Sequence, residues 1–146
     1  MAVEQTESSI CSSGTNVNAA YTIPEARAVG YGAHASRASP IDRVSVTGAA
    51  KLKGVTRRAI VPGATGDVAV AGVEMIETDG TGTVERGDRL AVSVAVDANE
   101  GRVFSTRATP PGIGVTFHIL GIAEDPAPAA VTRIRIRLTP GATLRG

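Results

Sequence analysis

The chain has 146 residues, with 15 basic and 14 acidic side chains and a formal net charge of +1. This length is usual for one domain, and the balanced charge excludes a global field that would gather nucleic acid or an anionic membrane. Two Tyr, two Phe and no Trp leave few aromatic faces for stacking bases or sugars. We therefore expect no nucleic-acid partner and no carbohydrate ligand.

Residues 1–40 differ from the remainder of the chain. They are rich in Ser, Asn, Ala and Gly and show hardly any apolar alternation, so they offer little surface to offset the entropy of ordering. This composition predicts an extended N-terminal arm, with Tyr21, Ile23 and Tyr31 as candidate anchors on a partner. The alternative is a short strand packed on its own domain.

The ends and the cysteine content indicate where the protein is made. No run of about 18 apolar residues spans a membrane, and the first residues lack the basic start and apolar stretch of a secretory signal. Cys11 is the only cysteine, which excludes an intrachain disulfide and a thiolate metal cluster within one chain. We expect synthesis in the host cytoplasm and no membrane partner.

Residues 41–146 predict a β-barrel-like or sandwich-like body, so the fold class is all-β. Short β-type runs alternate with strong turn signals such as Pro62-Gly63, Asp79-Gly80 and Pro140-Gly141. No helical periodicity of useful length occurs, and 36–48 is the nearest approach to one. The expected strands are 44–46, 56–61, 68–73, 83–84, 90–96, 102–104, 115–120 and 132–138.

A weak internal repeat links two parts of this body. In 52–70 and again in 120–136, a strand containing a Gly is followed by a turn with Pro and then by an alternating strand. Such a repeat is typical of a barrel whose two halves close on each other.

Catalytic candidates are scarce. His34 falls in the arm and His118 in an apolar strand, and neither belongs to a metal-binding or triad pattern. Acidic residues stand singly beside turns, where they cap backbone amides, and no calcium loop occurs. We therefore predict no enzyme activity and no catalytic, cofactor-binding or metal-binding residues, although an enzyme with an unfamiliar site stays a remote third hypothesis.

The most distinctive segment contains Arg133, Arg135 and Arg137, which alternate with apolar residues. Because strand side chains alternate between faces, the three guanidinium groups share one face and the apolar side chains share the other. One interpretation is a solvated face neutralised by neighbouring acids. The other is an interface stripe that pairs with carboxylates on a partner, with Arg57-Arg58 as a second, smaller patch.

Five short motifs occur in an order that resembles the capsid cement, or decoration, proteins of tailed phages. They are a Gly-Val strand end, a Gly-Asp turn before a Val-rich strand, a Gly-Asp-x-Leu element, a Gly-x-Ala element and a final alternating strand. The matching ranges are 53–56, 63–70, 84–90, 119–123 and 130–138.

This resemblance implies a structural role on the exterior of the virion. Such a protein binds the major capsid protein, commonly as a homotrimer at a symmetry axis, and clamps neighbouring subunits of the capsid. The long N-terminal arm departs from the family pattern. The competing hypothesis is a β-barrel accessory or fibre module that binds a ligand or receptor, which predicts a concave pocket with convergent polar groups.

Overall fold

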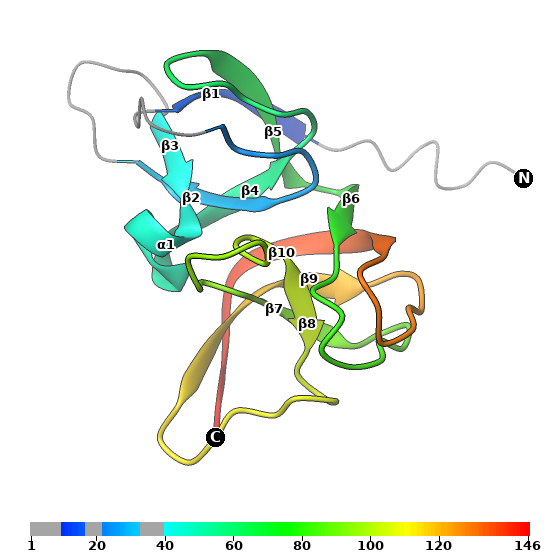
Figure 1. The fold of residues 1–146 in the computed structure, drawn as a ribbon. Coiled ribbons are helices and arrows are strands. Elements are labelled where there is room, and N and C mark those ends of the chain that lie inside the picture. The colour runs from blue at the N-terminus through cyan, green and yellow to red at the C-terminus, as the bar shows by residue number, and fades with distance from the viewer. Residues whose placement is uncertain (1–9, 17–21, 33–39) are drawn as a thin grey trace, which may run out of the picture.

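Figure 1 presents a computed structural model of the chain, in which the structure describes residues 10–16, 22–32 and 40–146. Side chains are described for 22–32 and 40–146. The chain forms two sheets and very little helix, which confirms the predicted all-β class.

The first sheet is a small closed barrel in the order β1-β3-β2-β4-β5. Its pairs are antiparallel except for a short parallel contact between β1 and β3, and β1 closes the ring by pairing with β5. A single helical turn, α1 (Val44–Thr47), and a 3-10 turn, η2 (Ala49–Lys51), connect β3 to β4. The strands are β1 (Ile10–Asn16), β2 (Ala28–Tyr31), β3 (Pro40–Arg43), β4 (Leu52–Thr56) and β5 (Thr65–Ala71).

The second sheet has five strands in the order β6-β10-β9-β7-β8, and all of its ladders are antiparallel. It lies beside the barrel, and the chain passes directly from β5 into β6 (Figure 1). The strands are β6 (Val73–Glu77), β7 (Arg89–Val92), β8 (Val103–Ser105), β9 (Thr116–Ala123) and β10 (Arg133–Arg145).

The repeat seen in the sequence corresponds to one hairpin in each sheet, β4–β5 in the barrel and β9–β10 in the second sheet. In both hairpins the Gly of the first strand lies against the backbone of the second. A Cβ at Gly54 would stand 2.0 Å from the Ala69 carbonyl oxygen, and one at Gly121 would stand 2.2 Å from the Arg137 carbonyl oxygen. The repeated Gly therefore permits close approach of the paired strands.

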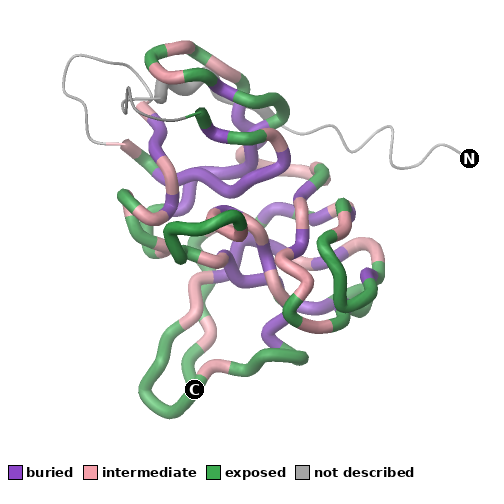
Figure 2. Tube along the Cα trace, viewed as in Figure 1, coloured by how far each residue is buried: buried purple, intermediate pink, exposed green. Residues whose placement is uncertain are grey.

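The two sheets share one apolar core. A single cluster of buried side chains includes Val44 from α1, Leu52 and Val55 from the barrel strand β4, and Leu90, Leu120 and Ile136 from the second sheet. A smaller cluster inside the barrel contains Ile23, Val29, Ile41, Ile60 and Val68. Buried and exposed segments are mapped in Figure 2.

The described parts of 1–40 do not form a separate arm. Residues 10–16 and 28–31 are barrel strands, and Val29 is fully buried. Their place in the ladder satisfies the backbone hydrogen bonds, so a sequence with little apolar alternation can still be ordered there. The predicted division between 40 and 41 thus falls inside the barrel, as the alternative of a strand packed on its own domain predicts.

Several strand predictions need correction. Residues 44–46, expected as a strand, form α1, which ends at Gly48 with a φ of 83°. Residues 83–84 contribute only an isolated bridge, Val84 with Ala127, and β6 was not predicted. The last strand continues to Arg145, because a bulge between Leu138 and Ala142 absorbs the Pro140-Gly141 turn signal.

Among the helices of the described ranges, none has the length and apolar character needed to cross a bilayer.

Candidate functional site

The three arginines predicted as an interface stripe all pair with acids of the same chain. Arg133 binds Glu25 at 2.7 Å and Glu77 at 3.0 Å. Arg135 binds Asp125 at 2.8 Å, and Arg137 binds Glu124 at 2.8 Å. The carboxylates that the stripe requires are thus supplied from within the chain, as the solvated-face interpretation predicts.

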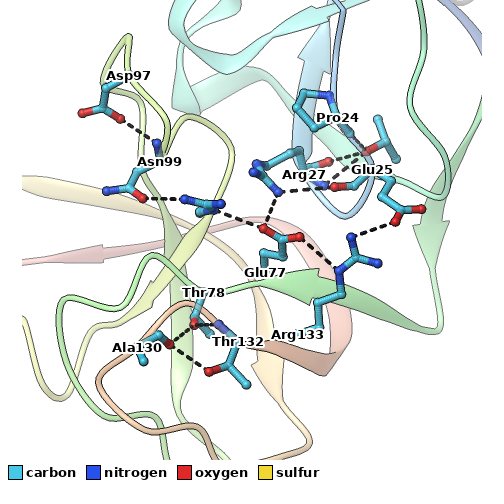
Figure 3. A network of polar contacts seen from close by, with 12 residues as sticks. Pro24, Glu25, Arg27, Glu77, Thr78, Asp97, Asn99, Ala130, Thr132 and Arg133 are labelled. Carbon is cyan, nitrogen blue, oxygen red and sulfur yellow. Dashed lines mark hydrogen bonds and ion pairs between the residues drawn. The ribbon is translucent and has the colours of Figure 1, made fainter.

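The carboxylate of Glu77, on β6, binds arginines from three separate segments of the chain (Figure 3). One carboxylate oxygen accepts Arg27 at 2.7 Å and Arg102 at 3.2 Å, and the other accepts Arg133. Burial acts to raise the pKa of Glu77, but the three arginines outweigh burial and hold that pKa below its ordinary value. This hub ties the segment before β2 to both edges of the second sheet.

The acids beside turns have the capping role that the sequence predicts. Asp79 accepts the Thr81 backbone N–H at 2.9 Å, and Asp97 accepts that of Asn99 at 2.7 Å. Asp88, in the Arg86-Gly87-Asp88 turn, accepts the Glu85 N–H at 2.8 Å.

Asp88 also serves as a buried anchor. It accepts the Ser105 hydroxyl at 2.7 Å and the Arg107 Nε at 3.2 Å. Burial acts to raise the pKa of Asp88, but these donors and the Glu85 N–H outweigh it, so the pKa lies below its ordinary value. Its carboxylate is therefore committed to the fold rather than to a ligand.

The candidate arm anchors lie in three different situations. Tyr21 falls outside the described residues. Ile23 is 2% exposed and forms a bridge with Ile60, so its side chain belongs to the barrel core and cannot anchor the chain on a partner. Tyr31 is 56% exposed, and the Lys53 ammonium lies 5.7 Å from its ring centroid. Ile23 and Tyr31 thus have different surroundings, one in the core and one at the surface.

No group of three His, Cys, Asp or Glu side chains that could hold a metal occurs within the described ranges. His118 stands alone on β9, partly exposed, and His34 lies outside the described residues.

Polar hollows are present but are lined by groups that bind one another. A groove of about 630 Å³ on the barrel contains Arg57, Arg58, Asp67 and Glu74, and Arg57 binds Glu74 at 3.1 Å. A smaller hollow of about 340 Å³ contains Arg43 and Glu100, whose charged atoms lie 3.6 Å apart. These pairs engage part of the charged lining of each hollow, and Arg58 and Asp67 line the larger one beside them.

An apolar groove of about 410 Å³ lies where β7 and β9 separate. Phe104 and Phe117 line it and form an edge-to-face pair with ring centroids 5.2 Å apart. Val94 and Val115 also line the groove and are 45% and 44% exposed. His118 is the one titratable group among the lining residues, so this surface is almost free of charge. No local sequence pattern predicts this groove.

The groove follows the side of a projecting two-stranded ribbon, formed by 116–119 of β9 and 142–145 of β10. β7 pairs with β9 only from Ile119 onward, so the ribbon extends beyond the sheet toward the C-terminus (Figures 1 and 2). Ile113, in the loop before the ribbon, is 102% exposed. The groove and this loop form an uncovered apolar surface beside the ribbon, which we call the apolar end.

These features define the class of the protein as an all-β chain of two sheets that share a core, with an uncovered apolar end. The chain matches no protein-family profile and has no significant match among curated proteins.

Proposed function

We propose that the protein is a capsid decoration protein, which binds the outer surface of a tailed-phage head and stabilises contacts between major capsid proteins. The apolar end carries this proposal. Apolar side chains that lie together and uncovered on the surface mark sites of interaction with other macromolecules. The charged side chains of the arginine stripe, in contrast, have partners within the chain.

The order of the five motifs supports the same proposal. Gly54 and Gly121 allow the two hairpins to close, and Asp88 fastens the turn before β7. The motifs shared with the cement proteins thus fall at positions that build the framework, where a related protein would need the same residues. The proposed role requires neither a cofactor nor a catalytic site, and the place of action is the exterior of the virion.

The proposed partner is the major capsid protein, and the proposed assembly on the capsid is a homotrimer. An apolar end of this kind can be covered partly by a sister subunit and partly by the capsid. In a homotrimer with closed three-fold symmetry, each subunit would present the same surface to the capsid lattice.

The test is co-sedimentation of the purified protein with phage capsids stripped of their decoration. We expect saturable binding, and we expect Val115→Asp to weaken it about tenfold or more, because a carboxylate in the interface would be desolvated. Val61→Asp is the matched control, since Val61 is 55% exposed on the barrel, away from the apolar end. Deleting 1–40 would remove β1 and β2, so point variants are the cleaner test.

Absence of binding to any stripped capsid would contradict the proposal. Equal weakening by Val115→Asp and Val61→Asp would show that capsid binding does not depend on the apolar end. Tight binding of a small molecule in the barrel groove at Arg58 and Asp67, with no capsid binding, would favour the accessory-module hypothesis.

A further inference from the structure

The outer edge of β10 is open along the ribbon. From Arg133 to Arg137, β10 is paired on one side with β6, and that ladder ends there. Over 142–145, β10 pairs with β9 on its other side. Within the described ranges, no strand pairs with the outer edge of 142–145.

The hydrogen bonds of the ribbon show which backbone groups face outward. Gly146 donates its N–H to the Val115 carbonyl at 2.9 Å, so the backbone of Gly146 faces β9. In an antiparallel ladder this orientation alternates, which turns Leu144 and Ala142 toward β9 and turns Thr143 and Arg145 outward. The outer edge therefore presents two N–H donors and two carbonyl acceptors, on residues that are exposed.

The side chains at this edge specify what a partner strand must carry. Leu144 lies opposite Phe117, on one face of the ribbon, and Arg145 lies on the other face beside Thr116. No ion pair of Arg145 occurs among the described residues, whereas Arg133, Arg135 and Arg137 each bind an acid. Of these four β10 arginines, Arg145 at the open edge is thus the one that has no acid partner among the described residues.

We propose that this edge binds an extended segment of the partner as an added β-strand, with an apolar side chain opposite Leu144 and a carboxylate opposite Arg145. The inference rests on the proposed function, so the segment belongs to the major capsid protein. Strand addition supplies affinity through main-chain hydrogen bonds and specificity through alternate side chains. An exposed strand edge is a ready template for such pairing.

Charge argues for a different partner rather than for a second copy of the same edge. Residues 139–146 contain no Asp or Glu. Antiparallel pairing of two such edges, centred on Leu144, would place each Arg145 opposite Thr143 of the other copy, so neither guanidinium would meet a carboxylate. A capsid segment with an acidic side chain meets the requirement.

The experiment compares Thr143→Pro with Thr143→Val in binding to stripped capsids. Proline removes an outward N–H and leaves the ribbon ladder to β9 intact, as is tolerated at strand edges. Valine keeps the N–H and the β-branched shape. We expect Thr143→Pro to weaken binding about tenfold, because one main-chain hydrogen bond to the added strand is lost. We expect the affinity of Thr143→Val to stay within about twofold of that of the parent protein.

A second pair of variants keeps the test decisive if Thr143→Pro fails to fold, as checked by thermal unfolding. Arg145→Glu should weaken capsid binding about tenfold or more, whereas Arg58→Glu, the same charge change on the barrel, should not. If the parent protein binds and both edge variants bind equally well, the edge inference is overturned and the proposed function stands. If the edge variants lose self-association but keep capsid binding, the partner is a second copy and the inference fails. If the parent binds no capsid, both fail.

Discussion

The two halves of β10 share one strand but have opposite surroundings. In 133–137 the apolar side chains enter the core, β6 pairs along one edge, β9 pairs along the other from Ile136 onward, and each arginine binds an acid. In 142–145 the side chains are mostly exposed, one edge is open, and Arg145 has no acid among the described residues. The boundary between the halves is the bulge at Pro140-Gly141.

This difference teaches that pairing inside the chain, rather than the charge itself, decides which half can bind a partner. A stripe of three arginines is the stronger signal in the sequence, yet its guanidinium groups are already engaged. Breaking those pairs on association would sacrifice existing contacts. A lone Arg beside open backbone groups gains contacts on association without losing any.

The sharpest way to test the comparison is truncation of one apolar side chain in each half. Ile136 is fully buried, so Ile136→Ala should lower the free energy of unfolding by about 3 kcal/mol through lost burial and a residual cavity. Leu144→Ala should lower it by less than about 1 kcal/mol, because Leu144 is only partly buried on the ribbon. Urea denaturation followed by circular dichroism measures both. Equal losses would show that the ribbon is as much a part of the core as the first half.

A smaller loss of stability is expected when Glu77, which binds Arg133 in the first half of β10, is neutralised. Glu77→Gln leaves Arg27, which is 8% exposed, without its carboxylate and should destabilise the protein by about 2 kcal/mol. Glu124→Gln removes only the exposed partner of Arg137 and should cost about 0.5 kcal/mol or less. Chemical denaturation at neutral pH distinguishes them. A cost for Glu77→Gln no larger than that for Glu124→Gln would mean that the hub does not hold the segment before β2.

The sequence was sufficient for the first half of β10 and insufficient for the second. Alternation of Arg with Ile and Leu predicts a strand with one buried face, and that strand is present. Pro140-Gly141 predicts the end of the strand, because Pro and Gly are typical of turns. The strand continues instead, because β9 pairs with 142–145, and no residue of that segment indicates this long-range pairing. The open edge follows from that continuation, so no local pattern could have indicated it.

The same limit explains the arm and the groove. The small and polar neighbours of Ile23 and Val29 predict an extended segment, whereas long-range pairing brings both residues into the barrel. Phe104 and Phe117 were both placed in expected strands, and β8 and β9 do contain them. Their shared groove depends on where β7 leaves β9, which is a property of the sheet and not of either segment.

The smallest expected change comes from mild acid, and its sign differs between two acids of the molecule. Glu77 has a lowered pKa in the folded protein, so its contribution to stability is present above the ordinary pKa of 4.5 and is lost as the pH falls through the folded pKa. Burial raises the pKa of Glu100 despite the nearby Arg43, so protonation favours the folded state there. The two groups therefore oppose each other as the pH falls.

This opposition gives a paired measurement. The parent protein should lose stability below about pH 4.5, where the unfolded chain takes up protons that the folded hub resists. Glu77→Gln should make the decline shallower, because one lowered pKa is removed. Glu100→Gln should make it steeper, because a group that gains from protonation in the folded state is gone. Urea midpoints at pH 7, 5, 4 and 3 would reveal the slopes. Parallel plots of stability against pH for the two variants would show that the first half of β10 does not depend on the charge of Glu77. The contrast between the two halves of β10 would then rest on burial alone.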